Sequence, residues 1–322
     1  MRESGDERAL SEVIGFVLLL ALFVTALSLW MMYVVPVNGR EDEITQMNYV
    51  RDSFTQYKFS VDEIWHSTMV YNLSPVMTST SFTLGTGGGN TAASGVFLSF
   101  LKPIASSATM SVLNTTDTFD IDSSSYHGSA ADTGEFPLNM TGLEYRSSNN
   151  YWIQQRYVYQ LGGVFLYQEY GSTARVSPLI SIVKAANNSV IVQVVPVQLI
   201  GGGSMGGNGP VRVDTRQISP GTKYNIYSDP YFANAWVNLS VSTADNTTAL
   251  LWQNIFTDIV LREGLDSAAY SIQKVYDTTS KRTTVYILIT GVNPSDTWND
   301  VSLYVTRADF YVTFNNIASV LT

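Results

Sequence analysis

The chain has 322 residues, with 27 acidic and 18 basic side chains, two histidines and no cysteine. A formal charge of −9, spread along the chain, argues against nucleic acid as a partner, because neutralising phosphates requires clustered lysines and arginines. The absence of cysteine excludes disulfides, thiolate zinc sites, iron–sulfur clusters and a cysteine nucleophile.

An uncharged segment near the N-terminus predicts a membrane-spanning helix. Glu12 and Arg40 are separated by 27 residues without a charge, and residues 13–35 are almost wholly apolar. As an α-helix, such a stretch reaches roughly 34 Å, which is enough to cross a hydrocarbon core of about 30 Å. Trp30 and Tyr33 fall near its C-terminal end, where aromatic side chains favour the membrane interface.

The residues that flank this segment bear on how it is processed and where it ends. Pro36 and Gly39 predict that the helix ends or kinks there. The leader MRESGDERA is short and acidic, unlike the basic start of a secretory signal. Cleavage after Ser28 by a signal peptidase is the alternative, although that site would lie inside the apolar run.

A specific pattern surrounds the start of the apolar segment. The sequence Asp6-Glu7-Arg8-Ala9 runs into Leu10-Ser11-Glu12-Val13-Ile14-Gly15. This resembles the class III signal of archaeal type IV pilins, in which a membrane prepilin peptidase cuts before a (V/L)-S-P-V-I-G start. The resemblance implies a leader over residues 1–9, a cut between Ala9 and Leu10, and an assembly motif. That motif comprises Ser11, Glu12, Val13, Ile14 and Gly15.

The sequence departs from the pilin pattern at two positions. Glu12 stands where archaeal pilins usually have proline, and Ile14 occupies the position of the helix glutamate of bacterial pilins. The role of that glutamate therefore has no counterpart here. What the resemblance implies is a transmembrane and assembly helix over residues 10–39 that remains attached after the cut and can bundle with like subunits in a filament.

The following stretch, residues 40–67, is predicted to be an amphipathic helix. Its apolar residues are spaced by 3, 3, 4, 3, 4 and 3 positions, which is one helical stripe. They are Ile44, Met47, Val50, Phe54, Tyr57, Val61 and Ile64. Two interpretations are open: a helix that lies on the sheet of the head, and a stalk that continues the anchor and packs against neighbouring subunits.

The remainder, residues 68–322, is predicted to be a β-rich head. Apolar residues alternate with polar ones between turn signals, almost without helix, which favours antiparallel sheets in a sandwich-like arrangement. We expect strands at 153–159, 163–168, 179–184, 189–199, 211–217, 235–241, 270–276, 283–290 and 301–314. The fold class is thus mainly β with a long apolar N-terminal helix.

One additional helix is predicted inside the head. Asp245 and its neighbours offer an N-terminal cap, apolar residues follow with a 3.6-residue period, and Gly264 ends the helix. A helix between strands is consistent with a parallel crossover or with two β subdomains. For the second arrangement the boundary would lie near Pro230.

Three segments of the head carry a second resemblance. The tracts 145–152, 157–164 and 194–210 are similar to uncharacterised pilin-like surface proteins of methanogenic archaea. This similarity implies an N-terminal anchor and a β-rich domain outside the cell, and it brings no catalytic residues.

The sequence predicts no catalytic, cofactor or metal site. His66 is expected to cap the end of its helix, and His127 lies in a serine-rich loop. The glycine tracts 85–90 and 201–209 lack the Gly-Lys-Ser/Thr of a phosphate-binding loop. The aspartates of the 117–122 segment lack the glycine and distal glutamate of an EF-hand.

Six asparagines begin N-x-S/T sequons, which matter if the head faces the outside of the cell. Those in turn-like contexts, Asn114, Asn187 and Asn246, are the candidate glycosylation sites. The other three are Asn72, Asn139 and Asn238.

Three classes of function follow. The leading hypothesis is a non-enzymatic, membrane-anchored pilin-like surface protein with a structural or adhesive role. The alternative is a single-pass envelope protein that never polymerises and binds glycan or protein through its head. Its candidate aromatic contacts are Tyr145, Tyr151, Trp152 and Trp298. An enzyme would need a carboxylate pair such as Asp258 and Glu263, for which helix surface charge is the simpler explanation.

Overall fold

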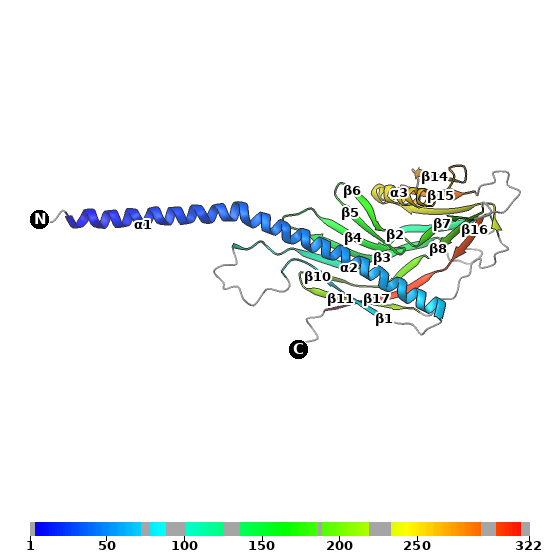
Figure 1. Ribbon diagram of the computed structural model, residues 1–322, viewed down its shortest axis with the longest axis horizontal. Coiled ribbons are helices and arrows are strands. Elements are labelled where there is room, and N and C mark those ends of the chain that lie inside the picture. Colours follow the sequence, from blue (N-terminus) through cyan, green and yellow to red (C-terminus); the bar gives the residue numbers. More distant parts are fainter. Residues whose placement is uncertain are drawn as a thin grey trace.

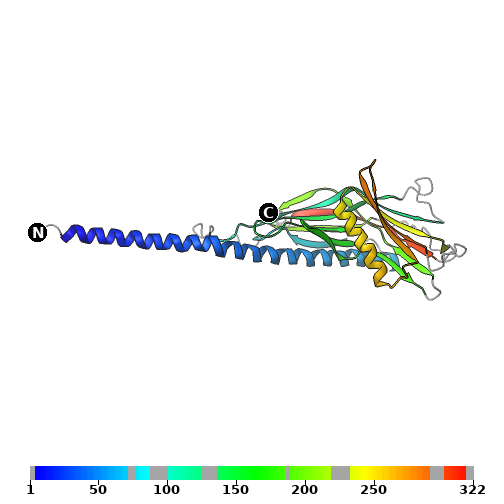
Figure 2. The ribbon, with the colours of Figure 1, turned by 90° about the horizontal axis from the view of Figure 1, so that it is seen from above.

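The computed structural model describes residues 4–71, 77–87, 101–124, 136–185, 189–218, 233–290 and 301–316. One long N-terminal helix is followed by a β-rich head with mostly antiparallel sheets and one further helix, which is the predicted fold class. The first half of the long helix projects from the head, and the second half lies along it (Figures 1 and 2).

The long helix is continuous through the positions where an end was predicted. Helix α1 (Ser4–Leu29) passes through a π-helical turn (Trp30–Val34) into α2 (Val35–Tyr71). Pro36 has no N–H to donate to the carbonyl four residues earlier, and its ring crowds that carbonyl. The wider turn relieves this crowding, with the Val35 N–H bonded to the Trp30 carbonyl. Pro36 therefore reshapes the helix without ending it.

Helix α2 lies on the head of its own chain, as in the first of the two interpretations of this stretch. Residues of its apolar stripe are buried against the strands, and four of them have no exposed surface: Val50, Phe54, Tyr57 and Val61. Burying a side chain of this size contributes about 1.5–3 kcal/mol, so the stripe as a whole outweighs surface ion pairs of up to about 1 kcal/mol. A stalk that leaves this stripe free for neighbouring subunits is therefore not what the structure has.

The head is built around a nine-stranded antiparallel sheet. Its order is β14-β15-β13-β2-β3-β4-β5-β6, and β10 pairs with β2 beside this path. The bounds are β2 (Ser107–Ser123), β3 (Leu138–Ser148), β4 (Gln155–Gln160), β5 (Gly163–Gln168), β6 (Gly171–Val176), β10 (Ser204–Gly207), β13 (Val237–Thr243), β14 (Tyr270–Asp277) and β15 (Arg282–Ile289).

Two four-stranded sheets complete the head. One has the order β1-β11-β17-β9, the other β12-β16-β8-β7. Their bounds are β1 (Met77–Thr83), β7 (Ile180–Lys184), β8 (Val190–Val194), β9 (Val197–Gly201), β11 (Pro210–Gln217), β12 (Ala233–Asn234), β16 (Val301–Val305) and β17 (Ala308–Asn316).

Two segments that were predicted as single strands each cross between the small sheets. The 189–199 segment is divided into β8 and β9 at Pro196, and the 301–314 segment into β16 and β17 at Arg307. The two run parallel to one another in both sheets. The Thr306 N–H bonds to the Val194 carbonyl, and the Ala308 N–H to the Pro196 carbonyl, so the breaks lie side by side.

The nine-stranded sheet separates two hydrophobic cores. One core joins α2, the β1-β11-β17-β9 sheet and one face of the central sheet. The other joins helix α3 (Asn246–Arg262), the β12-β16-β8-β7 sheet and the opposite face. Strand β2 contributes to both, with Met110 in the first core and Phe119 in the second.

The additional helix is α3, with the predicted cap. The Asp245 carboxylate accepts from the Thr247 and Thr248 N–H groups, and Gly264 follows the helix in the left-handed conformation, with φ of 62°. The helix contacts β13, β14 and β15 as well as β6, so the central sheet curls around it. Trp252 is fully buried between Phe165 and Phe256.

The head is not divided near Pro230, a residue outside the described part of the chain. Strand β13, from beyond this position, pairs with β2, and β17 pairs with β11. Strand β16 likewise pairs with β8, so strands from both sides of the proposed boundary share all three sheets.

Candidate functional site

The feature with the clearest functional chemistry is the exposed apolar helix. The segment Glu12–Thr68 includes one window long and apolar enough to cross a membrane, and none of that window is buried within the chain. Phe16, Leu19 and Leu22 are each more than two-thirds exposed. Exposed apolar surface of this size marks an interaction site, and its length and composition are compatible with a membrane span.

The residues of the proposed processing motif lie at the far end of this helix. Ala9, Leu10 and Ser11 belong to α1, and their side chains are outside the described part. Glu12, Val13, Ile14 and Gly15 are exposed, and nothing lies within 4 Å of the position that a Cβ would take at Gly15. Within the described part of the motif, Glu12 to Gly15, the side chains are thus exposed and not packed against the head.

The long helix is fixed to the head through a buried carboxylate. Glu43 on α2 is 1% exposed. Its Oε1 accepts a hydrogen bond from the Asn150 N–H at 2.6 Å, and its Oε2 accepts from the N–H groups of Tyr151 at 2.8 Å and Trp152 at 2.6 Å. These donors belong to the connection between β3 and β4. Hydrogen bonds to an ionised acceptor are stronger than neutral ones, so this contact ties the helix to the head.

Two aromatic contacts surround this carboxylate. The ring of Tyr151 packs against Gly39, where it occupies the space that a Cβ would take. The Arg40 guanidinium lies over the Trp152 ring, 4.5 Å from its centroid. We call Gly39, Arg40 and Glu43 together with Asn150, Tyr151 and Trp152 the collar.

Sequence reasoning missed the collar. Gly39 was assigned to the end of the anchor helix, Arg40 and Glu43 to the amphipathic helix that follows, and Tyr151 and Trp152 to contacts with a glycan or protein ligand. The available signal was Gly39 itself, because a glycine inside a helix marks a close approach of another group.

Strand register places several connections at the same end of the head as the collar. Ser107 pairs with Ser148, and Gln155 with Gln168. The segment 101–106, the β3–β4 connection and the β5–β6 turn therefore share one edge, from which α1 projects (Figure 1). Thr86 also bonds to Ser106 there. We call this edge the anchor end.

The remaining aromatic candidates do not form a ligand platform. Tyr145 is fully buried, and its hydroxyl donates to the Leu84 carbonyl at 3.3 Å. Burial raises its pKa. Trp298 lies outside the described residues.

The described histidine and acidic residues form no metal-binding cluster. His66 is exposed, and α2 continues past it to Tyr71, so the helix does not end at His66 as predicted. His127 lies outside the described residues. Asp117 pairs with Arg282 at 3.5 Å, and Asp120 accepts from the Ile121 N–H. Across the described ranges, no group of three or more acidic or histidine side chains is arranged to hold a metal ion.

Two of the three candidate glycosylation asparagines are on the described surface. Asn114 is exposed in β2, beside the irregularity in its pairing with β3, and Asn246 is exposed at the start of α3. Asn187 lies outside the described residues. Of the other sequons, Asn139 is exposed, and Asn238 is half-buried with a buried Oδ1.

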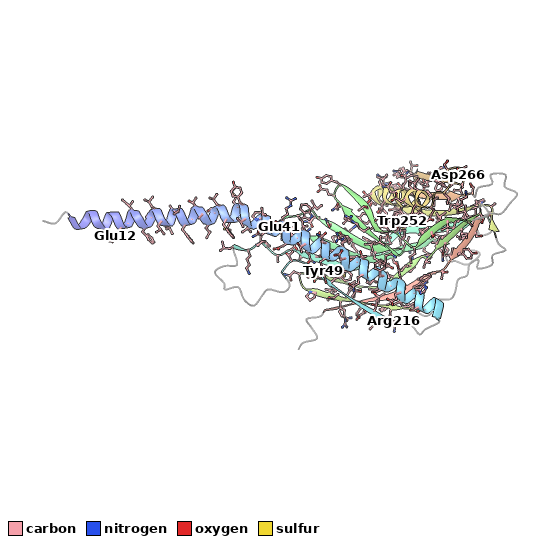
Figure 3. All side chains as sticks on the ribbon, viewed as in Figure 1. Glu12, Glu41, Tyr49, Arg216, Trp252 and Asp266 are labelled. Carbon is pink, nitrogen blue, oxygen red and sulfur yellow. The ribbon has the colours of Figure 1, made fainter. Side chains whose placement is uncertain are left out.

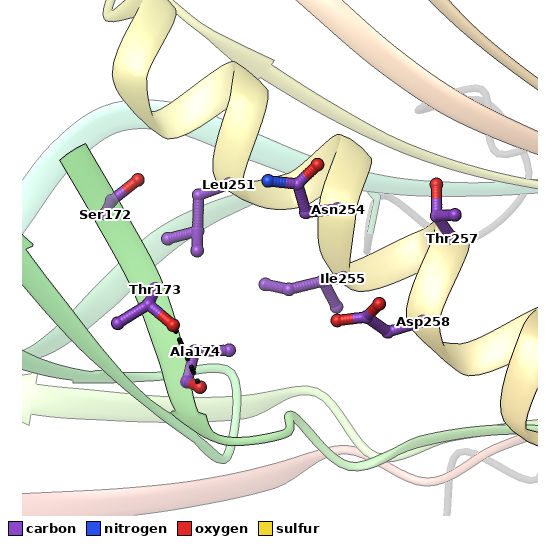
Figure 4. A pocket seen from close by; sticks show the side chains of 8 residues that line it. All are labelled: Ser172, Thr173, Ala174, Leu251, Asn254, Ile255, Thr257 and Asp258. Carbon is purple, nitrogen blue, oxygen red and sulfur yellow. Dashed lines mark hydrogen bonds between the residues drawn. The ribbon is translucent and has the colours of Figure 1, made fainter.

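A hollow of about 280 Å³ lies between the edge strand β6 and α3 (Figure 4). Its lining is mostly polar: Ser172, Thr173, Ala174, Leu251, Asn254, Ile255, Thr257 and Asp258. Asp258 is one half of the carboxylate pair considered for an enzyme. The other, Glu263, is not among the lining residues and pairs with Arg262 at 3.4 Å. The hollow therefore holds one carboxylate of the pair.

Comparison of the chain with family models, with curated proteins and with solved structures found no significant match.

Proposed function

We propose that the protein is a membrane-anchored surface protein of the type IV pilin-like class, structural or adhesive and non-enzymatic. The single observation that carries this proposal is the contrast between the two halves of one helix. The window that follows Glu12 is apolar and wholly exposed, whereas the α2 stripe is buried in the head. The exposed half has the length and composition of a bilayer span, and the same surface suits a bundle of like helices.

The pilin-like part of the proposal rests on the N-terminal sequence. A charged leader, an alanine before the cut and an immediate apolar helix are the features that the prepilin peptidase recognises in archaeal pilins, and here they are Ala9, Leu10 and the residues that follow. Cleavage before Leu10 removes the charged leader and leaves the whole apolar window attached to the head. In this proposal the head faces the outside of the cell, and like subunits associate through their α1 helices.

N-terminal sequencing of the mature protein, isolated from membranes of its source, tests the processing. A start at Leu10 supports the proposal, whereas an intact Met1 or a start at Leu29 contradicts it. The Ala9→Asp variant is expected to remain unprocessed, because the peptidase acts at a small residue. The matched variant Asp6→Ala, which also changes one charge in the leader, is expected to be cut normally.

Electron microscopy of purified surface material shows whether the helix only anchors the protein in the membrane or also assembles it into filaments. Filaments that carry this chain support assembly through the helix. Monomers alone would favour the second hypothesis, a non-polymerising single-pass envelope protein that binds through its head.

A further inference from the structure

We propose that the anchor end of the head lies directly on the membrane surface, with Ile104 inserted at the boundary between lipid and water. This inference rests on the proposed membrane insertion of α1, and it concerns a surface of the head that the anchor alone does not require. The occupant of this surface is the lipid bilayer itself.

The collar lies close to the C-terminal end of the membrane span. Gly39 follows Val35, the last residue of the apolar run, by four positions, which is roughly 6 Å along a helix. The headgroup layer of a bilayer is about 5–8 Å thick on each side of the hydrocarbon core. Because the helix continues unbroken from the span into α2, Gly39 and Arg40 lie at the level of the headgroups.

Contacts of the collar connect the helix to Ile104 on the head. The Tyr151 ring packs on Gly39, and its hydroxyl accepts a hydrogen bond from the Ile104 N–H at 3.1 Å. The Asn150 amide donates to the carbonyls of Ile104, at 3.4 Å, and Ala105, at 3.2 Å. One tyrosine side chain therefore links Ile104 to the helix at headgroup level.

The surface beside the collar combines exposed aliphatic side chains with an aromatic ring and a basic group. Ile104 is 69% exposed, Val37 is 56% exposed and Ile153 is 38% exposed, all beside the collar. Single exposed aliphatic residues are common on soluble proteins and need no explanation. Here they accompany Trp152 under the Arg40 guanidinium, and an aromatic ring with a basic group is the pairing favoured at membrane interfaces. A bilayer covers the aliphatic side chains and leaves the guanidinium among the phosphates.

The absence of cysteine allows a direct test, because single cysteines can be labelled with a nitroxide in the full-length protein. We compare Ile104→Cys with Met77→Cys and Val24→Cys after reconstitution in phosphatidylcholine vesicles. Met77 is a matched control, an apolar residue 58% exposed at the start of β1. Strand β1 reaches the anchor end only after Thr83, so Met77 is roughly 20 Å further from it. Val24 lies in the middle of the span.

The accessibility of each label to oxygen, which partitions into lipid, and to a water-soluble nickel chelate gives its depth. We expect the oxygen-to-nickel ratio at Ile104 to be several-fold higher than at Met77 and lower than at Val24. An Ile104 label as accessible to nickel as the Met77 label, with Val24 inside the bilayer, overturns this inference and leaves the anchor intact. A Val24 label in water instead overturns the proposed insertion itself.

A third outcome identifies a different partner. If the Ile104 label is shielded from both oxygen and nickel and its spectrum is broadened by a second label, the anchor end contacts another copy of the chain. That result also overturns the membrane contact. The variant Ile104→Asp, at an exposed position, is expected to keep the melting temperature and to return a label at Ile153→Cys to the nickel accessibility of Met77.

Discussion

The ring of Tyr151 packs against Gly39 so closely that a methyl group at Gly39 would overlap it. This contact is one of those that join the helix to the head at the collar, and it depends on the absence of a side chain at position 39.

Replacing Gly39 with alanine therefore reverses the usual effect of this substitution in a helix. Alanine favours a helix over glycine by about 1 kcal/mol, but overpacking costs typically about 1–3 kcal/mol. We expect Gly39→Ala to lower the melting temperature of the full chain in detergent, followed by circular dichroism. Gly15→Ala, with open space around it, is the control and is expected not to lower it. Equal effects in the two variants would contradict the contact.

Neutralising Glu43 is expected to loosen the collar. In Glu43→Gln an amide nitrogen can face backbone N–H groups that now bond to carboxylate oxygens. Leaving a buried donor unpaired costs about 1–3 kcal/mol. Urea unfolding of the head, followed by tryptophan fluorescence, measures this loss.

The matched control is Glu41→Gln on the exposed side of the same turn. It is expected to change the free energy of unfolding by less than about 0.5 kcal/mol. If Glu43→Gln changes stability no more than Glu41→Gln does, the carboxylate does not hold the helix to the head.

Two tyrosines that touch in the core are expected to respond oppositely to loss of the hydroxyl. The Tyr57 hydroxyl lies 2.9 Å from that of Thr215, whereas the buried Tyr159 hydroxyl has no hydrogen-bond partner within the described ranges. Burial holds the pKa of Tyr159 well above its ordinary value, so the group stays neutral. Tyr57→Phe should cost about 1 kcal/mol, and Tyr159→Phe should be neutral or stabilising in thermal unfolding. A loss in Tyr159→Phe as large as that in Tyr57→Phe would reveal a partner for Tyr159.

The cap of α3 is expected to make stability depend on pH. Partial burial opposes ionisation of Asp245, but hydrogen bonds from Thr247 and Thr248 outweigh it and lower the pKa. A depressed pKa in the folded state stabilises the fold above the unfolded value of about 3.9, and this contribution is lost as the pH falls through the lower, folded value. Asp245→Ala should cost about 0.5–2 kcal/mol at pH 7.

The variant Asp245→Asn isolates the effect of the charge, because asparagine keeps an oxygen acceptor. The free energy of unfolding of this variant, measured in urea, should differ most from that of the original chain at neutral pH. The difference should shrink as the pH falls below about 4. A difference that is constant from neutral to acid pH would contradict a role for the ionised carboxylate.

The elements with a single unbroken pattern were predicted from the sequence. The apolar stripes of α2 and α3 each repeat one helical period without interruption, and the cap and the glycine of α3 mark its two ends. Their local signals agree with the packing, so these helices follow from the sequence pattern. The hairpin of β4 and β5 is buried on both faces and was placed by its short, mostly apolar strands.

Strands β2 and β3 were missed because their apolar residues change face along their length. In β2, Met110 points into the core with α2, and Phe119 into the core with α3. In β3 the same change occurs around Gly142, between Met140 and Leu143. A strand that separates two cores buries opposite faces at its two ends, and no single alternation describes it.

The collar was missed for a different reason. Glu43 and Tyr151 are separated by 108 positions, and each has an ordinary local interpretation, one as a charge near a helix start and the other as a loop aromatic. Only the folded structure brings them together. There the backbone N–H groups of the loop stabilise the buried carboxylate.

The unbroken helix also determines how the head would resist a pull on its anchor. Force along α1 passes through the π-helical turn into α2, which lies lengthwise on the head (Figure 3). The buried stripe from Met47 to Ile64 is then loaded in shear, so its contacts must fail together and cannot peel away one at a time. The contact between α2 and the head therefore resists a pulling force along the whole buried stripe.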